Sequence, residues 1–200
     1  MHHHDSSPAP RAVLFDRDGT LVVDVPYNGD PSLVVAMPTA RETVQGLRDR
    51  GVPIGVVSNQ SGIARGIVTR EQVDAVNREV DRLLGPFDVW CVCPHGPEDD
   101  CRCRKPRPGM VHDAAAALGV ELTSVAVIGD IGADMGAARA AGARGVLVPT
   151  VVTLPEEVRD AELVATDLAG AVALLFASAS AGAAAHEATE DGAAQDGATP

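Results

Sequence analysis

The stretch AVLFDRDGT, residues 12–20, decides the fold, because a short apolar run ends abruptly in two aspartates. Four apolar residues without polar alternation are typical of a parallel strand that is buried on both faces. Working outward, comparable runs cover residues 53–57, 87–92, 125–128 and 145–148, with helical patterns between them. Strands that alternate with helices predict an α/β fold, namely a three-layer, Rossmann-like parallel sheet with helices on both faces.

The helices of this fold are predicted from their ends and from their apolar stripes. Thr39 is placed to cap a helix that ends at Gly51, and Thr69 with Gln72 has the spacing of a capping box. A last strand is expected near Leu163. The helices are expected after Thr39, after Thr69, and over residues 108–118, 135–141 and 168–176.

Composition limits the domain organisation. The 200 residues suit one α/β domain, which we assign to residues 11–176. Residues 1–10 contain three consecutive histidines and are expected to be tag-like or disordered. Residues 177–200 lack large aliphatic side chains, so we expect a disordered, acidic tail rich in Ala and Gly.

Charge and hydropathy exclude several classes of partner. The net charge of −12 disfavours nucleic acid and anionic membranes, which require clustered Lys and Arg. There is no apolar run long enough to span a bilayer and no signal-peptide core, so a cytoplasmic protein is expected. The absence of coiled-coil heptads leaves a monomer as the expected state.

Polar residues follow three of the predicted strands, at the edge where parallel sheets bind ligands. Asp16 can attack phosphorus, and Asp18 can protonate the leaving alkoxide and later activate water. Ser58 offers a hydroxyl to a phosphoryl oxygen, and Lys105 a fixed positive charge. Asp16, Asp18 and Asp130 form a predicted magnesium site, with Asp134 expected only to brace the loop.

Cysteines concentrate in one loop. Cys93, His95, Cys101 and Cys103 offer three thiolates and one imidazole, which is a closed tetrahedral set for structural zinc. Cys91 is left over and is expected to be a buried thiol, although it is close enough to compete. Two disulfides would suit an extracellular protein, but the chain lacks a secretion signal.

The ordered set D-R-D-G-T, Ser58, Lys105 and G-D…D resembles the four motifs of the haloacid dehalogenase-like phosphatases over residues 11–176. Within that superfamily, C-P-H…C-x-C-R-K-P and S-N-Q-S-G-I-A-R-G resemble the D-glycero-D-manno-heptose 1,7-bisphosphate 7-phosphatase group. The resemblance implies a compact enzyme of nucleotide-heptose biosynthesis with a minimal cap, a zinc-binding loop and a small phosphorylated sugar as its substrate. It also implies the substrate-binding residues Asp24, Val25, Pro26, Tyr27, Ser58, Asn59, Gln60, Ser61, Arg65, Arg104 and Lys105.

Two positions depart from the pattern of that group. Ile131 stands where the group carries Lys, and Pro26 replaces a Gly. A missing cation would weaken binding of the distal phosphate unless Arg65 compensates. Both changes affect specificity more than chemistry.

Three alternatives remain open at this stage. Histidinol-phosphate phosphatases share the motifs and the zinc loop. A signalling receiver domain also surrounds magnesium with acids, a hydroxyl and a Lys, but its phosphorylated Asp lies on a later strand. A degenerate, zinc-stabilised binding module would have lost activity, although all five catalytic positions are retained here. The anomer of the sugar, the pathway and the role of the tail are not determined by the sequence.

Overall fold

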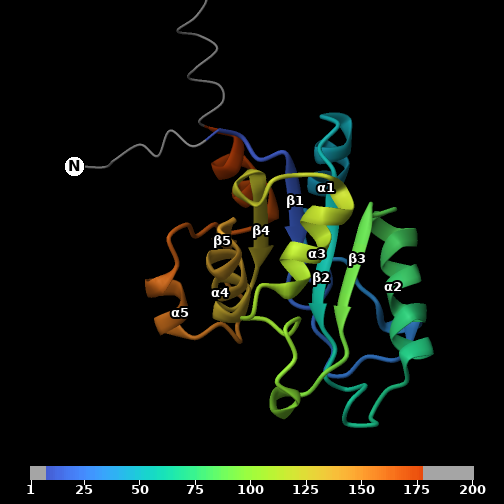
Figure 1. Ribbon diagram of the computed structural model, residues 1–200. Coiled ribbons are helices and arrows are strands. Elements are labelled where there is room, and N and C mark those ends of the chain that lie inside the picture. The colour runs from blue at the N-terminus through green and yellow to red at the C-terminus, as the bar shows by residue number, and fades with distance from the viewer. Residues whose placement is uncertain (1–7, 178–200) are drawn as a thin grey trace, which may run out of the picture.

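The computed structural model describes residues 8–177 (Figure 1), so the predicted unstructured segments 1–10 and 177–200 lie almost entirely outside the described residues. Its centre is a five-stranded parallel sheet in the order β3-β2-β1-β4-β5, which confirms the predicted α/β architecture. The strands are β1 (Ala12–Phe15), β2 (Ile54–Asn59), β3 (Val89–Cys93), β4 (Val125–Gly129) and β5 (Arg144–Leu147).

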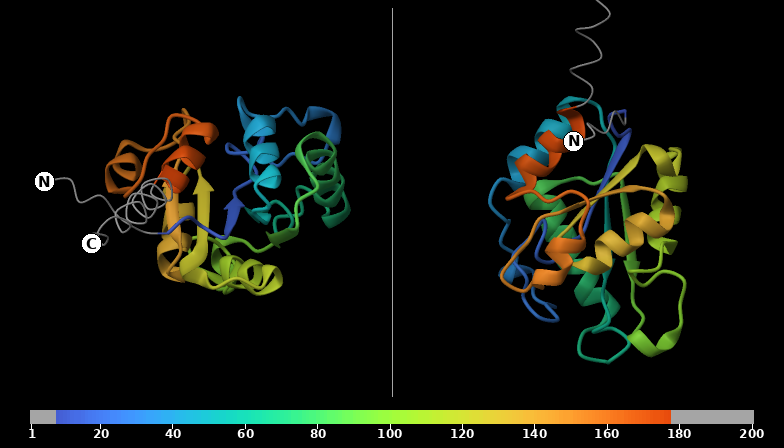
Figure 2. Two further views of the ribbon diagram at one scale, coloured as in Figure 1. Left: turned by 90° about the horizontal axis from the view of Figure 1, so that it is seen from above. Right: turned by 90° about the vertical axis from the view of Figure 1, so that its left-hand side faces the viewer.

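Helices cover both faces of the sheet (Figure 2). Helices α1 and α2, with a helical segment at residues 168–177, cover one face, and α3 and α4 cover the other. The helices are α1 (Ala40–Asp49), α2 (Arg70–Leu84), α3 (Gly109–Leu118), α4 (Gly132–Ala141) and α5 (Pro155–Asp160). Three 3-10 turns lie at Pro31–Leu33, Pro97–Asp99 and Leu122–Ser124.

The central strand supplies side chains to two separate cores. Val13 and Phe15 pack with α1 and α2, whereas Ala12 and Leu14 pack with α3 and α4. This division follows from the period of two in a strand, and all four side chains are fully buried. A strand covered on both faces reads as an uninterrupted apolar run, which is why β1 was recognisable from sequence.

Two local predictions are wrong, and one helix was not predicted. Thr39 does not cap α1, because its backbone is left-handed and its side chain makes no capping hydrogen bond. The strand expected near Leu163 is only an isolated bridge between Leu147 and Val164, since the chain follows β5 for a single residue pair. Helix α5, which begins with a proline, was not predicted. The capping box of Thr69 and Gln72 is confirmed.

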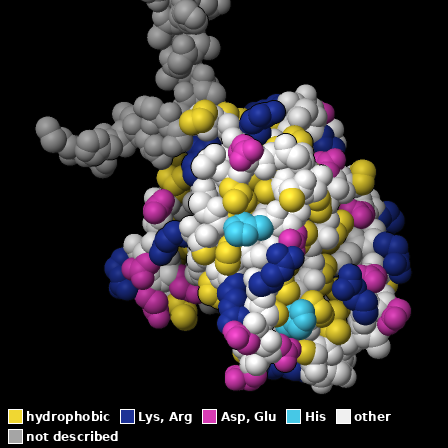
Figure 3. Space-filling model, in the orientation of Figure 1, with side chains coloured by type: hydrophobic (Ala, Val, Ile, Leu, Met, Phe, Trp, Pro, Cys, Tyr) yellow, Lys and Arg dark blue, Asp and Glu magenta, His cyan; other side chains and the backbone are white. Residues whose placement is uncertain are grey.

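The surface mixes charges of both signs. On the face that carries α2 and α3, basic and acidic side chains are interspersed among apolar ones (Figure 3). Within residues 8–177, no helix combines the length and the apolar character that crossing a bilayer requires.

Candidate active site

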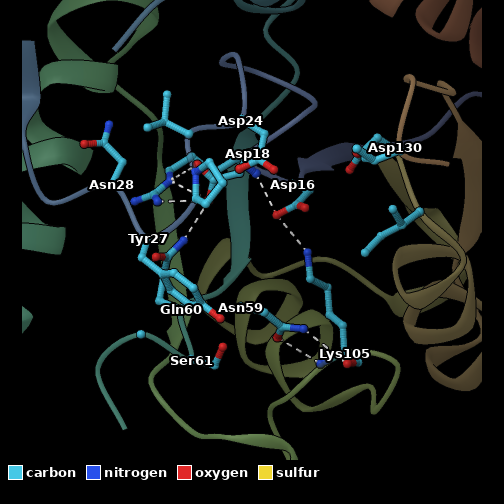
Figure 4. A pocket seen from close by; sticks show the side chains of 16 residues that line it. Asp16, Asp18, Asp24, Tyr27, Asn28, Asn59, Gln60, Ser61, Lys105 and Asp130 are labelled. Atoms are coloured by element: carbon cyan, nitrogen blue, oxygen red, sulfur yellow. Dashed lines mark hydrogen bonds and ion pairs between the residues drawn. The ribbon is translucent and has the colours of Figure 1, made fainter. Parts of the chain in front are cut away.

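The carboxyl ends of the three central strands meet at one cavity of about 360 Å³ (Figure 4). Asp16 follows β1, Asn59 ends β2, and Asp130 follows β4. The parallel registers of β1 with β2 and β4 bring these strand ends to the same edge. Of the residues predicted from sequence, the cavity is lined by Asp16, Asp18, Asp24, Val25, Pro26, Tyr27, Asn59, Gln60, Ser61, Lys105 and Asp130.

Lys105 lies between two buried carboxylates. Its Nζ is 2.8 Å from Asp16 Oδ1 and 2.6 Å from Asp134 Oδ1, and it also donates to the Val57 carbonyl at 2.8 Å. Burial alone would lower the pKa of the ammonium, but the carboxylates of Asp134 and Asp16 outweigh it and raise the pKa. Lys105 therefore stays charged, pointing at Asp16 as Figure 4 shows.

Asp16, Asp130 and Asp134 form a compact group of carboxylates. One oxygen from each lies within 4.8 Å of the others, and all three side chains are buried. Burial raises the pKa of Asp16 to about 8 against the attraction of Lys105, and burial together with Asp134 raises the pKa of Asp130 to about 7. Three carboxylates facing one ammonium leave excess negative charge, which a hard cation with oxygen ligands would balance.

Two threonines hold Asp130 by hydrogen bonds, and a glycine leaves room for its carboxylate. Thr150 Oγ1 donates to its carboxylate at 3.4 Å, and Thr153 Oγ1 donates to its carbonyl at 2.6 Å. Gly19 has φ of +77°, and a Cβ at this position would collide with the Asp130 carboxylate. The glycine of the D-R-D-G-T motif therefore lets the first loop approach the end of β4.

Asp18 is held by neighbours on both sides. Arg17 Nη2 donates to Asp18 Oδ2 at 2.9 Å, and Gln60 Nε2 donates to the same oxygen at 2.8 Å. Gln60 Nε2 also donates to Ser58 Oγ at 2.9 Å. The side chain of Ser58 is almost fully buried and does not line the cavity; Gln60 and Asn59 line it instead.

One wall of the cavity is built around Tyr27. This residue has a left-handed backbone, φ 53°, which is uncommon for a side chain of its size. Arg65 Nη1 donates to Tyr27 Oη at 2.7 Å, and its guanidinium lies 5.7 Å from the ring centroid. Arg65 thus reaches the edge of the cavity through Tyr27. The apolar residues Ile131 and Val152 also line the cavity.

Arg104 does not line the main cavity. It lies in an adjoining hollow of about 330 Å³, where its Nη1 donates to the His95 carbonyl at 3.4 Å. Lys105 borders both spaces, so the two hollows meet at this residue.

The predicted zinc ligands come together. Cys103 Sγ lies 3.3 Å from both Cys93 Sγ and His95 Nδ1, and Cys93 Sγ lies 3.7 Å from Cys101 Sγ. A tetrahedral zinc with bonds of about 2.3 Å to sulfur places its ligands roughly 3.5–3.8 Å apart, so the set fits. Cys91 lies outside this group, and burial raises the pKa of its thiol to about 11.

Two functional contacts were missed by the sequence analysis. Asp134 was expected only to brace a loop, yet it is fully buried and forms an ion pair with Lys105. Asn77 on α2 was not singled out, but its Oδ1 accepts from Arg17 Nη1 at 2.7 Å. The only sequence signal for Asn77 was an amide in the apolar stripe of α2.

Comparison with known proteins gives consistent results. Residues 102–173 match the family model described as HAD-hydrolase-like. A D-glycero-beta-D-manno-heptose-1,7-bisphosphate 7-phosphatase from Pseudomonas aeruginosa is 34% identical over 172 residues, covering 82% of this chain and 97% of that protein. The enzyme of the same name from Mesorhizobium japonicum is 40% identical over 149 residues, covering 68% and 69%.

A solved structure agrees with these relatives. The D,D-heptose 1,7-bisphosphate phosphatase from B. bronchiseptica, complexed with magnesium and phosphate, has a TM-score of 0.73 and 30% identity. The match covers 83% of this chain and 98% of that one.

Proposed function

The chain belongs to the haloacid dehalogenase-like phosphatases, within the group of D-glycero-D-manno-heptose 1,7-bisphosphate 7-phosphatases, and on this basis we propose its substrate, its metal ions and the roles of its residues. The proposed reaction removes the 7-phosphate of D-glycero-D-manno-heptose 1,7-bisphosphate through an aspartyl-phosphate. The observation that carries the chemistry is the carboxylate group of Asp16, Asp130 and Asp134 opposite Lys105.

In the first half-reaction, Asp16 is the nucleophile. Its carboxylate oxygen bonds to phosphorus while the bond from phosphorus to the sugar O7 breaks. Asp18 gives its proton to O7, so the sugar leaves as an alcohol. Lys105, which contacts Asp16 Oδ1 at 2.8 Å, stabilises the negative charge on the phosphoryl oxygens. The buried Ser58 accepts a hydrogen bond from Gln60, which also donates to Asp18, so Ser58 helps to hold the acid/base residue in place.

In the second half-reaction, Asp18 accepts a proton from water as the water oxygen attacks phosphorus. The acyl-phosphate bond breaks, phosphate leaves, and the Asp16 carboxylate is restored. Each proton that Asp18 gives in the first step is thereby recovered in the second. One residue serves as acid and then as base, as the symmetry of the two displacements requires.

Magnesium is the proposed catalytic cation. Asp16 and Asp130, with the backbone carbonyl of Asp18, would hold it, and Asp134 adds a third carboxylate to the same group. When bound, Mg²⁺ neutralises charge on the phosphoryl group and aligns it with the nucleophile. The raised pKa values of Asp16 and Asp130 support this assignment, because burial disfavours the ionised carboxylates that a bound cation would stabilise.

Zinc is the proposed structural metal. Cys93, His95, Cys101 and Cys103 provide four ligands and no open position for chemistry. Lys105 follows the last ligand by two residues, so the metal would fix the loop that directs this cation at Asp16. Thiolate ligands suit the reducing cytoplasm, where we place the enzyme, as a monomer.

The distal 1-phosphate needs a cation beyond the catalytic centre. Arg17 and Lys105 line the cavity, but both are buried and paired with carboxylates. Arg65 makes no ion pair within residues 8–177 and is held at the cavity edge by Tyr27. We assign the distal phosphate to Arg65, with Arg104 as a second cation from the adjoining hollow. Asp24 and Ser61 then face the sugar hydroxyls.

Histidinol phosphate is the competing substrate. The apolar wall of Ile131 and Val152 suits an imidazole ring, and the Asp24 carboxylate suits an amine. Both substrates would use the same chemistry at Asp16, so only kinetics separates them.

The test is kcat/KM with Mg²⁺ for both anomers of heptose 1,7-bisphosphate and for histidinol phosphate, with Asp16→Asn as the blank. We expect a heptose bisphosphate to be preferred by at least about 100-fold, which corresponds to about 2.7 kcal/mol. Preference for histidinol phosphate would retain the mechanism and overturn the substrate. Turnover by Asp16→Asn would overturn the covalent mechanism.

A further inference from the structure

Arg17 is a fully buried cation, and each of its three guanidinium nitrogens donates to one of two side chains, Asp18 and Asn77. Its Nη2 donates to Asp18 Oδ2 at 2.9 Å, and its Nε lies 3.1 and 3.2 Å from the two Asp18 oxygens. The remaining nitrogen, Nη1, donates to Asn77 Oδ1 at 2.7 Å. The exposed fraction of Arg17 is 1%, so a missing partner would not be replaced by bulk water.

Asn77 occupies a position where packing alone would favour an aliphatic side chain. It lies on the buried stripe of α2 between Val73 and Val80, and its exposed fraction is 8%. An amide in such a position costs free energy unless its polar atoms are hydrogen-bonded. The only hydrogen bond of its side chain described within residues 8–177 is the one from Arg17. The helix thus presents one polar atom toward the catalytic loop.

The two carboxylate oxygens of Asp18 differ in the number of hydrogen bonds that they accept. Oδ2 receives Arg17 Nη2, Arg17 Nε and Gln60 Nε2, which saturates its lone pairs. Oδ1 receives only Arg17 Nε, at 3.1 Å. One lone pair therefore remains on Oδ1 for a proton that moves to or from a substrate, while the planar guanidinium prevents rotation of the carboxylate.

We propose that Asn77 is a positioning residue for the acid/base Asp18 and acts on it through Arg17. The inference rests on the proposed role of Asp18 but assigns a function to a residue of α2 that does not line the cavity. Without its acceptor at Asn77, the guanidinium is free to tilt, and Asp18 loses the orientation that directs Oδ1 at the leaving oxygen.

The test uses two substrates of nearly the same shape. 4-Nitrophenyl phosphate releases an anion that needs no proton, whereas phenyl phosphate releases a phenolate of pKa about 10 that benefits from one. Asn77→Leu keeps the branched shape and removes the acceptor. In single-turnover experiments it should slow phenol release by about tenfold or more, and nitrophenolate release by less than about threefold.

Two further variants serve as controls. Val80→Ala removes volume from the same buried stripe but leaves the hydrogen bond from Arg17 to Asn77 in place, so the ratio of the two rates should equal that of the native protein. Asn77→Asp retains an oxygen acceptor and should restore the ratio. If Asn77→Leu slows both substrates equally, or neither, Asn77 has only a structural role or none, and the proposal is overturned.

Asp18→Asn separates failure of this inference from failure of the proposed function. Asp18→Asn should slow phenol release more than nitrophenolate release, as Asn77→Leu does, and the difference between the two substrates should be larger. A flat response in Asp18→Asn would overturn the acid role itself and the Asn77 proposal with it. If Asp18→Asn slows phenol release selectively but Asn77→Leu leaves the ratio of the two release rates as in the native protein, the Asn77 proposal alone is overturned.

Discussion

The side chain of Asn59 clamps the backbone of Lys105 with two hydrogen bonds. Asn59 Nδ2 donates to the Lys105 carbonyl at 3.2 Å, and the Lys105 amide donates to Asn59 Oδ1 at 3.1 Å. Residues 46 positions apart are thereby joined, so the end of β2 fixes the segment that carries the buried cation Lys105. Asn59 also lines the cavity, but both of these hydrogen bonds join it to the backbone of Lys105.

Asn59→Ala should lower kcat by about 10- to 100-fold, because Lys105 loses its fixed distance to Asp16. It should also lower the free energy of unfolding by about 1–3 kcal/mol, since two backbone groups lose partners. Enzyme assays and urea unfolding would measure both. Asn59→Asp keeps the acceptor and should show a smaller loss; equal loss in the two variants would contradict the clamp.

Magnesium affinity should weaken as the pH falls. The pKa is raised to about 8 for Asp16 and to about 7 for Asp130, so both carboxyls bind protons in the cation-free protein below these values. Mg²⁺ requires the ionised form, and its binding must release these protons. Its dissociation constant should rise by at least about tenfold from pH 8.5 to pH 6, measured by titration calorimetry.

Asp24→Asn is the matched control for the magnesium experiment. Burial also raises the pKa of Asp24, which lines the same cavity but lies outside the carboxylate group. The variant should keep the pH dependence of the native protein. A dissociation constant that is constant between pH 6 and pH 8.5 would show that the carboxylate group is not the cation site.

Loss of one thiolate should remove zinc and destabilise the protein. Cys101→Ser should reduce the zinc content from one equivalent to a small fraction and lower Tm by about 5 °C or more, as a loss of about 2 kcal/mol predicts at this size. Cys91→Ser is the control, because Cys91 lies outside the ligand group. Metal analysis would measure the zinc content, and thermal unfolding would measure Tm. If Cys101→Ser contains no zinc and keeps the Tm of the native protein, zinc has no structural role.

Arg65 should discriminate bisphosphates from monophosphates. Arg65→Ala removes the cation that Tyr27 holds at the cavity edge, so KM for heptose 1,7-bisphosphate should rise by about tenfold or more. KM for a sugar monophosphate should change little. Steady-state kinetics with the two substrates would reveal the difference, and a parallel rise for both would place Arg65 outside the distal site.

Ile131→Lys makes the complementary change. Ile131 lines the cavity, and a Lys at this position adds a cation where the native side chain is apolar. KM for the bisphosphate should fall, and the loss caused by Arg65→Ala should shrink in the double variant. Unchanged KM in Ile131→Lys would mean that the distal phosphate lies away from this position.

The sequence predicted those parts of the fold that depend on local patterns. The four residues of β1 were recognisable because both faces of the strand are covered, and the Thr69 capping box because its two partners are three residues apart. The strand predicted near Leu163 is wrong, since an apolar residue beside a sheet edge has the same local pattern as a short strand.

The candidate site was predictable in its residues and less so in their contacts. Asp16, Lys105 and Asp130 follow recognisable motifs and do line one cavity. The ion pair of Lys105 with Asp134 depends on how α4 docks on the sheet, and no local signal encodes it. The same holds for Asn77, whose partner Arg17 lies 60 residues earlier in the chain.

The strand order places β1 between β2 and β4, at the centre of the sheet. The centre of the sheet therefore differs from its two edges in how freely its residues can change. Asp16 and the strands beside it lie in the buried interior, where nearly every side chain of β1, β2 and β4 is buried. The outermost strands, β3 and β5, instead carry the cysteine loop and the segment with Val152. Substitutions at the margins of this sheet can therefore change which phosphate ester fits the cavity with little effect on the packing at its centre.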